Sequence, residues 1–177
     1  GAVALFPVAL EACASAGRPG GVETPSMVSY TGTGGRGAMT LTAEAGVGET
    51  TLAESPTAVW AVLPAVFRVL GVEATVTDRA SGQMGNPGFR PRRIENRRLS
   101  LFLDCGSGLT GDYADVYQVD MMLRVEVVST SPESTTVRTT VDAYAQDRNT
   151  SGNPIHCRSR GSLERRVGEL VAARLAA

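Results

Sequence analysis

The sequence predicts one α+β domain, in which an antiparallel β-sheet of about four to six strands carries two helices on one face. Residues 116–146 alternate in polarity on both sides of a turn, which is typical of a long β-hairpin. Residues 56–70 and 162–175 repeat apolar side chains at helical spacing. The chain has 177 residues, of which 42% are hydrophobic and 20% charged, so it can form one packed core.

The helix expected at 56–70 has clear boundary signals. Ser55 can cap its first turn, and Pro56 suits the first helical position. Gly71 can end the helix in a left-handed conformation. Pro64, which lies inside the segment, is expected to kink it. The expected apolar face comprises Val59, Leu63, Val66, Phe67 and Leu70.

Shorter segments complete the expected order before the hairpin. Residues 39–43 and 72–77 alternate in polarity and are typical of strands. Residues 80–88 are rich in glycine and polar side chains and predict a loop, which is followed by a third strand at 99–103. Residues 106–112 contain three glycines and predict a turn.

The hairpin and the last helix supply most of the remaining apolar surface. One face of the hairpin is expected to be solvated and the other covered by helices, because an alternating face needs an apolar partner. Its turn is expected at 130–134, and Ser162 can cap the last helix. The covered face would hold Tyr117, Val119, Met121, Leu123, Val125, Val127, Val137, Thr139, Val141, Ala143 and Ala145. The apolar stripe of the last helix would hold Leu163, Val167, Leu170, Val171 and Leu175.

This order of elements resembles the helix-grip type of α+β domain, as in the envelope lipoprotein BamC. The resemblance is topological and covers about residues 38–176. It carries no residue-level motif, so it implies no site residue.

The N-terminal segment has the character of an export signal. Residues 1–10 are apolar and uncharged, and small residues follow them, as in the hydrophobic region and cleavage site of a secretory signal. Residues 10–13, Leu-Glu-Ala-Cys, resemble the lipobox of bacterial lipoproteins, with Glu11 where a small or apolar residue is usual. This resemblance implies lipidation of Cys13. Ordinary cleavage after Ala16 and a short apolar helix in the core are the alternatives.

These features divide the chain into three expected parts. Residues 1–12 are expected to be part of a signal peptide, 13–37 a flexible tether rich in Gly, Ser and Pro, and 38–177 a single α+β domain. The expected location is outside the cytoplasm, on a membrane that acyl chains on Cys13 anchor, facing the periplasm or the cell exterior. No apolar run is long enough to predict a membrane-spanning helix.

Cys105 and Cys157 remain if Cys13 is lipidated, and an even pair in an exported chain predicts a disulfide. Free buried thiols are one alternative. A zinc site that includes Asp104 and His156, or Cys105 acting as a nucleophile with His156 as its base, is another. The spacing typical of zinc sites is absent, and His156 is the only histidine, so no metal is predicted.

The densest charged feature is a group of arginines within residues 90–98. Such a group can bind the anionic groups of lipids, glycans or an acidic protein. The alternative is a solvated loop whose arginines pair with carboxylates on the sheet. A net charge of -1 argues against a nucleic-acid partner recognised through bulk positive charge. The group comprises Arg90, Arg92, Arg93, Arg97 and Arg98.

The predicted function is therefore that of a non-enzymatic envelope lipoprotein domain, which acts as an interaction or accessory module. Its expected partners are the membrane, through lipidated Cys13, and an envelope protein, an anionic lipid or a glycan. The alternative is a domain that binds an apolar small molecule or lipid in a groove between the 56–70 helix and the sheet. Trp60, Phe67 and Met121 would line that groove.

Catalytic chemistry has little support in the sequence. A hydrolase would use Cys105 or a group of four aspartates. The same aspartates could also form a calcium-binding site. Their spacing lacks the pattern of a calcium loop. None of the common catalytic or nucleotide-binding motifs is present, so no catalytic residue and no cofactor is predicted. The aspartates are Asp104, Asp112, Asp115 and Asp120.

Overall fold

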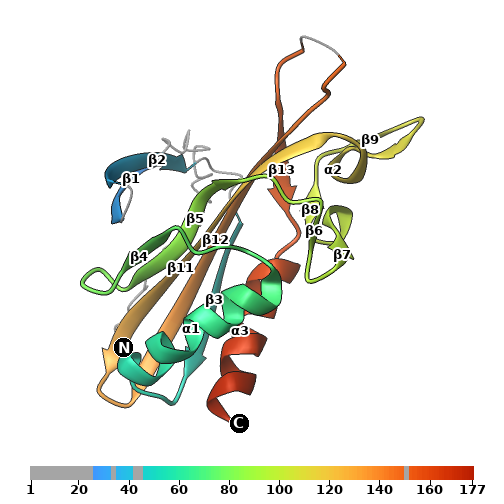
Figure 1. The fold of residues 1–177 in the computed structure, drawn as a ribbon. Helices are drawn as coiled ribbons and strands as arrows, with labels where there is room; N and C mark the ends of the chain where they lie inside the picture. The colour runs from blue at the N-terminus through green and yellow to red at the C-terminus, as the bar shows by residue number, and fades with distance from the viewer. Residues whose placement is uncertain (1–25, 33–34, 42–45, 150–151) are drawn as a thin grey trace, which may run out of the picture.

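The computed structural model describes residues 26–32, 35–41, 46–149 and 152–177, and Figure 1 shows their fold. Its centre is an antiparallel sheet of seven strands in the order β4-β5-β11-β12-β13-β8, with β3 also paired to β12. The α+β class predicted from the sequence is confirmed. The strands are β3 (Gly46–Leu52), β4 (Val76–Asp78), β5 (Gln83–Phe89), β8 (Leu103–Asp104), β11 (Gln118–Ser131), β12 (Ser134–Gln146) and β13 (Ile155–Ser159).

The β11–β12 hairpin is the element that the sequence predicted most directly. The two strands pair antiparallel over almost their whole length, with Met121 opposite Ala143 and Leu123 opposite Val141. Their alternating apolar side chains face the helices and are buried. The opposite face is only partly solvated, because Met122, Thr140 and Asp142 are also buried. The expectation of one fully wet face is therefore wrong for this part of the sheet.

Helix α1 (Pro56–Leu70) has the predicted boundaries. The Ser55 hydroxyl oxygen accepts a hydrogen bond from the Ala58 N–H at 3.3 Å, which caps the first turn. Gly71 ends the helix with φ 72°, where glycine has no steric penalty. The helix continues through Pro64, whose side chain is exposed.

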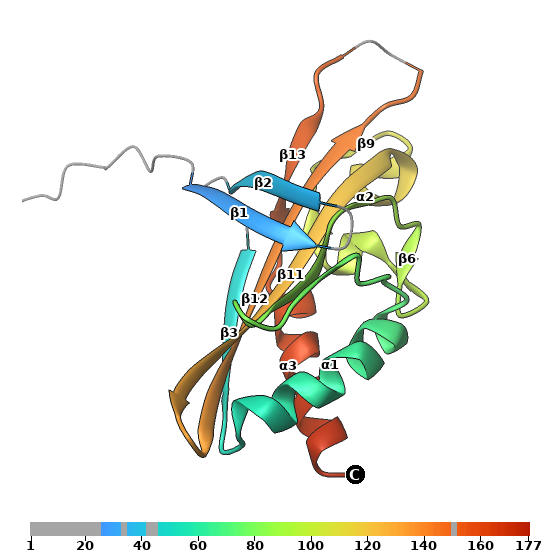
Figure 2. The same cartoon turned by 60° about the vertical axis from the view of Figure 1, so that its left-hand side comes forward.

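Helix α3 (Ser162–Leu175) packs beside α1 on the same face of the sheet, as Figure 2 shows. Gly161, with φ 72°, precedes it, and Ser162 is its first residue instead of its cap. The Ser162 hydroxyl donates to the Leu101 carbonyl oxygen at 2.7 Å. One core joins the helices and the sheet, and its largest members include Leu63, Phe67, Leu70, Met121, Leu123 and Leu163.

An insert of residues 90–117 connects β5 to β11 and projects from one side of the sheet (Figure 1). Its elements are short and closely connected. They are β6 (Arg93–Ile94), β7 (Arg97–Arg98), the 3-10 helix η1 (Leu99–Leu101), β8, β9 (Ser107–Gly108), β10 (Gly111–Asp112) and α2 (Tyr113–Val116).

The segment predicted as a loop at 80–88 contains strand β5, so that prediction is wrong. Gly85 suits the strand because a Cβ there would lie 2.4 Å from the Leu123 carbonyl oxygen of β11. The buried Asn86 amide donates to the Glu73 carbonyl oxygen at 2.8 Å and accepts from the Gly88 N–H at 3.0 Å. Glycine and asparagine, which are typical of loops, are thus used here for close packing and for internal hydrogen bonds.

Other strand predictions change in extent. The strand expected at 72–77 is only β4, and the one expected at 99–103 is η1 followed by the short β8. Strands β3 and β13 were not predicted. β3 pairs with β12, which is distant from it in the sequence, and β13 pairs with both β12 and β8. Local patterns carry little information about such pairings.

Strands β1 (Ser26–Gly32) and β2 (Gly35–Leu41) form a separate antiparallel hairpin, with Ser26 opposite Leu41. This hairpin lies largely within the range expected to be a tether and includes most of the strand expected at 39–43. The expected signal peptide and Cys13 lie outside the described residues. Among the described residues, none of the helices has both the length and the apolar character needed to cross a bilayer.

Candidate functional site

The predicted arginine group forms a short, ordered hairpin, which we call the arginine hairpin (residues 90–98). Strands β6 and β7 pair with Arg93 opposite Arg98, and Glu95 and Asn96 form a two-residue turn with φ 50° and 58°. This left-handed geometry matches the twist of antiparallel strands. The Ile94 side chain is 0% exposed and anchors the hairpin in the core.

Glu95 attaches the tip of the arginine hairpin to both helices. Its N–H donates to the Leu70 carbonyl oxygen at the end of α1, at 3.1 Å. Its carboxylate accepts from the Arg166 guanidinium of α3, with Nε 3.1 and 3.0 Å from the two oxygens and Nη2 in closer contact. The hydrogen bond from Arg166, reinforced by its charge, lowers the pKa of Glu95 although partial burial opposes this.

All five arginines are exposed, and they differ in their partners. Arg90 pairs with Asp120 of β11, Nε to Oδ1 at 2.5 Å. The Arg93 guanidinium donates to the Asn96 carbonyl oxygen at 3.1 Å, within the hairpin itself. Among the described residues, no side-chain hydrogen bond or ion pair involves Arg92, Arg97 or Arg98. Pairing with carboxylates of the sheet therefore accounts for Arg90 alone.

Acidification is expected to weaken the attachment of the arginine hairpin. The pKa of Glu95 is lower in the folded protein than its ordinary value of 4.5, so its ionised form contributes stability above that value. This contribution is lost as the pH falls through the lower folded pKa. We expect Glu95→Gln to remove about 1 kcal/mol of stability at neutral pH and to flatten its decline between about pH 5 and pH 3.

Urea unfolding across this pH range measures the effect. Glu133→Gln is a matched control, because Glu133 is exposed in the β11–β12 turn. Its pH dependence should follow that of the wild type. A Glu95→Gln curve parallel to the wild-type curve would contradict the role assigned to the ion pair.

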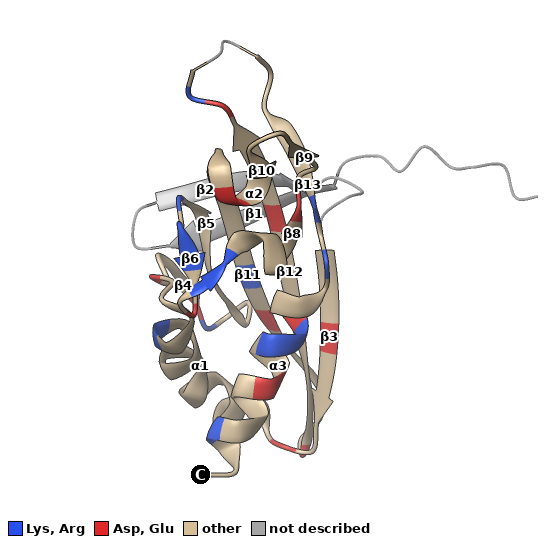
Figure 3. Ribbon diagram, turned by 90° about the vertical axis from the view of Figure 1, so that its right-hand side faces the viewer, with Lys and Arg blue, Asp and Glu red and all other residues tan. Residues whose placement is uncertain are grey.

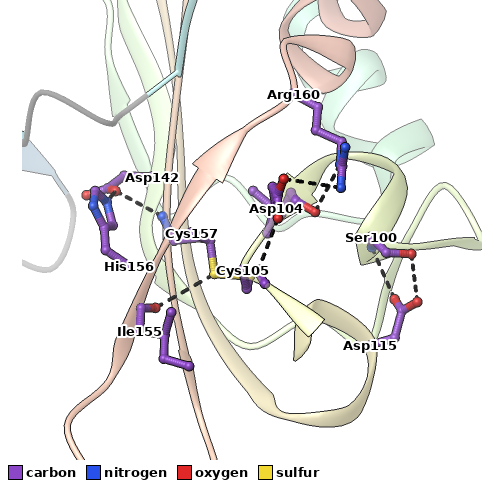
Figure 4. The surroundings of a disulfide bond; sticks show 12 residues. Ser100, Asp104, Cys105, Asp115, Asp142, Ile155, His156, Cys157 and Arg160 are labelled. Carbon is purple, nitrogen blue, oxygen red and sulfur yellow. Dashed lines mark hydrogen bonds and ion pairs between the residues drawn. A yellow bond between two sulfur atoms is a disulfide. The ribbon is translucent and has the colours of Figure 1, made fainter. Parts of the chain in front are cut away.

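The predicted disulfide is confirmed: Cys105 and Cys157 are bonded, with their Cα atoms 4.2 Å apart (Figure 4). Both sulfurs are thereby occupied, so neither the zinc alternative nor the Cys105 nucleophile applies to this oxidised chain. His156 contacts Asp142 instead, Nε2 to Oδ1 at 2.5 Å, and its ring stacks on that of Tyr144. A shallow pocket of about 320 Å³ lies beside the bond, lined by Asp104, Cys105, Gly106, Ile155, His156 and Arg158.

The four aspartates that suggested catalysis or calcium have separate structural contacts. Asp104 accepts from the Gly106 N–H at 3.1 Å, and Asp115 accepts from the Ser100 N–H and hydroxyl at 3.1 and 2.7 Å. Asp120 pairs with Arg90, while Asp112 is exposed in β10. Within the described part of the chain, no three His, Cys, Asp or Glu side chains are placed to share a metal ion.

The predicted apolar groove is not formed by the three residues assigned to it. Phe67 and Met121 are each 2% exposed and pack in the core. Trp60 is half-buried and lines a depression of about 230 Å³ together with polar and small residues. The helical face packs directly on the sheet, and its large side chains fill the space that a groove would need. The other lining residues are Pro56, Thr57, Arg79, Ala80, Ser81, Gly82 and Val127.

Comparison of the chain with protein-family models, with curated proteins and with solved structures gives no match. Lipidation at residues 10–13 and membership of the helix-grip type of domain therefore remain predictions. The arginine hairpin exposes five guanidinium groups within nine residues. Sequence reasoning identified its arginines but missed Glu95 as their attachment, for which the Glu-Asn pair between arginines was the available turn signal.

Proposed function

We propose that this domain is a non-enzymatic interaction module that binds an anionic partner through the arginine hairpin. The observation that carries the proposal is the presence of three exposed guanidinium groups, on Arg92, Arg97 and Arg98, that form no ion pair among the described residues. Arg97 acts on Glu95 only through its charge, at a separation longer than an ion pair. Guanidinium groups bind carboxylates and phosphates through paired hydrogen bonds. The proposed ligands therefore carry phosphate, sulfate or carboxylate groups.

The way in which the arginine hairpin is held supports this function. The buried Ile94 and the contacts of Glu95 with Leu70 and Arg166 fix its backbone. A rigid backbone lowers the entropy that is lost when the arginines bind a partner. Figure 3 shows basic residues at β6 and at the short strand paired with it, on the side of the molecule that faces the viewer.

The proposed location is the bacterial envelope, with the chain exported and anchored through Cys13. The disulfide supports an oxidising compartment, because cytosolic proteins rarely keep such bonds. The lipobox-like residues 10–13 and the apolar segment before them support the anchor. In this position the domain would present its arginines near the membrane and near other envelope components.

Binding of an apolar small molecule or lipid is the weaker alternative. It would use the depression beside Trp60, because Phe67 and Met121 belong to the core. The depression has a volume of about 230 Å³, and its lining includes the charged Arg79 and the polar Thr57 and Ser81. Ligand pockets are usually larger and mostly apolar.

Charge reversal tests the proposed function. We expect Arg97→Glu/Arg98→Glu to weaken binding to heparin, a soluble sulfated polyanion, by roughly tenfold or more at low salt. Isothermal titration calorimetry at several salt concentrations measures this change. The matched control is Arg148→Glu/Arg174→Glu, which alters net charge equally at two exposed sites outside the hairpin.

The control should bind heparin within about twofold of the wild type, since only local charge is expected to matter. Equal losses in both variants would show that net charge alone governs binding. That result, or a wild type that fails to bind any polyanion or anionic surface, would contradict the proposed function.

A further inference from the structure

Leu109 is the most exposed large apolar residue among the described residues. It lies in the two-residue loop between β9 and β10, where Gly108 pairs with Gly111, and its side chain is fully exposed. Leu101 and Val116, in the same insert, are 53% and 42% exposed. Among the described residues, half of the exposed large hydrophobic side chains thus lie in this one segment. These three positions make the insert a candidate for an interaction surface.

The β9–β10 hairpin holds Leu109 away from the core in a defined position. The Tyr113 ring packs against its backbone, where a Cβ on Gly108 would lie 2.8 Å from ring atoms. Tyr113 in turn stacks on Tyr117, with ring centroids 4.5 Å apart. The Tyr113 N–H also donates to the Gly106 carbonyl oxygen at 2.9 Å. Tyr113 and Tyr117 thus pack against the backbone of the hairpin whose loop exposes Leu109.

The two hairpins of the insert project from the same side of the sheet, as Figures 1 and 3 show from perpendicular directions. Contacts inside the insert join them. Ser100, just after β7, is hydrogen-bonded to Asp115 of α2, and α2 follows directly from β10. The disulfide and the Arg160–Asp104 ion pair then attach the insert to the end of β13. One extended surface can consequently contact both hairpins.

The charges of the insert favour an anionic surface. Three of its four carboxylates are already engaged: Glu95 with Arg166, Asp104 with Arg160, and Asp115 with Ser100. The fourth, Asp112, is exposed at the base of the β9–β10 hairpin. The guanidinium groups of Arg92, Arg97 and Arg98 are exposed and form no ion pair among the described residues, and the β9–β10 hairpin that carries Leu109 projects from the same side of the sheet (Figures 1 and 3). Basic side chains beside an exposed apolar one are the combination that binds membrane interfaces.

We propose that the insert docks on an anionic phospholipid bilayer, with the arginine hairpin at the headgroup phosphates and Leu109 inserted at the headgroup–acyl boundary. This inference rests on the proposed function and names its partner. A hydrated glycan offers no favourable environment for Leu109, whereas the bilayer interface accommodates apolar and cationic groups together.

Vesicle co-sedimentation tests the proposal. The full chain with Cys13→Ser is used, so that acyl chains add no binding. We expect it to bind phosphatidylcholine vesicles that contain phosphatidylglycerol more tightly than pure phosphatidylcholine vesicles. Leu109→Ser should weaken partitioning about tenfold, and Arg97→Glu/Arg98→Glu should weaken it at least tenfold. Leu109→Ser should leave thermal unfolding unchanged, because the side chain has no packing contacts to lose.

Two controls isolate the surface. Val47→Ser alters an apolar side chain that is 59% exposed on β3, outside the insert, and Arg148→Glu/Arg174→Glu alters charge elsewhere. Both should partition within about twofold of the parent chain.

The outcomes separate this inference from the proposed function. A parent chain that binds heparin but neither type of vesicle would overturn the membrane inference and leave the proposed function, with an acidic protein or glycan as its partner. Vesicle binding lost with the arginines but unaffected by Leu109→Ser would overturn the insertion of Leu109. Failure to bind heparin and vesicles alike would overturn both proposals.

Discussion

Replacing Cys105 and Cys157 together with serine is expected to lower the free energy of unfolding by about 3 to 4 kcal/mol. The bond joins residues 52 positions apart, so it strongly restricts the unfolded chain. It also connects Cys105, which directly follows β8 in the insert, to Cys157 of β13, and both cysteines are buried. Serine would place two hydroxyl groups in that interior. Urea unfolding of the oxidised wild type and of the double variant measures the difference.

Two comparisons control this experiment. Reductant should reduce wild-type stability by a similar amount, while Cys13→Ser should leave it unchanged, because its thiol has no part in the bond. A double variant within about 1 kcal/mol of the wild type would contradict the prediction.

Intact mass measurement tests the proposed export and lipidation. The protein is expressed in a bacterium with a complete signal peptide. A chain that begins at Cys13 with added acyl mass, and that exposes two further thiols only after reduction, is the expected result. An unlipidated chain whose thiols react without reduction would remove the basis for the envelope assignment.

Phe67→Ala is expected to lower the free energy of unfolding by about 3 to 5 kcal/mol. Phe67 is among the largest fully buried side chains and lies where α1 packs on the sheet. Removing its ring leaves a cavity that neighbouring side chains can fill only in part. Denaturant titration gives the value, and Leu101→Ala, at a site 53% exposed, should change stability by no more than about 0.5 kcal/mol.

This measurement also decides between a filled core and a ligand groove beneath α1. A cost below about 1 kcal/mol for Phe67→Ala would mean that the ring is already solvated. The apolar small-molecule alternative would then regain support. A large cost leaves the depression beside Trp60 as the remaining place for such a ligand.

Elements with strong local signals could be predicted from the sequence. Ser55, Pro56 and Gly71 mark both ends of α1 because capping and backbone preferences act within one turn. The β11–β12 hairpin follows from its alternating polarity. The disulfide follows from the number of cysteines and the expected compartment.

Elements that depend on distant partners could not be predicted. Strand β3 contains Gly46 and Gly48, which locally favour a loop. A Cβ on Gly48 would lie 2.5 Å from the Cβ of Glu164 on α3, so glycine here permits helix and strand to approach closely. That requirement comes from a residue more than a hundred positions away, and no local pattern contains it.

The candidate site divides in the same way. The amino-acid sequence by itself determined that five arginines lie close together, since proximity along the chain ensures it. Only the tertiary structure decided that Arg166 of α3 engages Glu95 and that Arg92, Arg97 and Arg98 form no ion pair among the described residues. It also decided that Leu109 is exposed in a hairpin whose backbone at Gly108 packs on Tyr113. Exposure and ion pairing depend on which remote side chains the fold brings near, and the order of residues does not specify those distances.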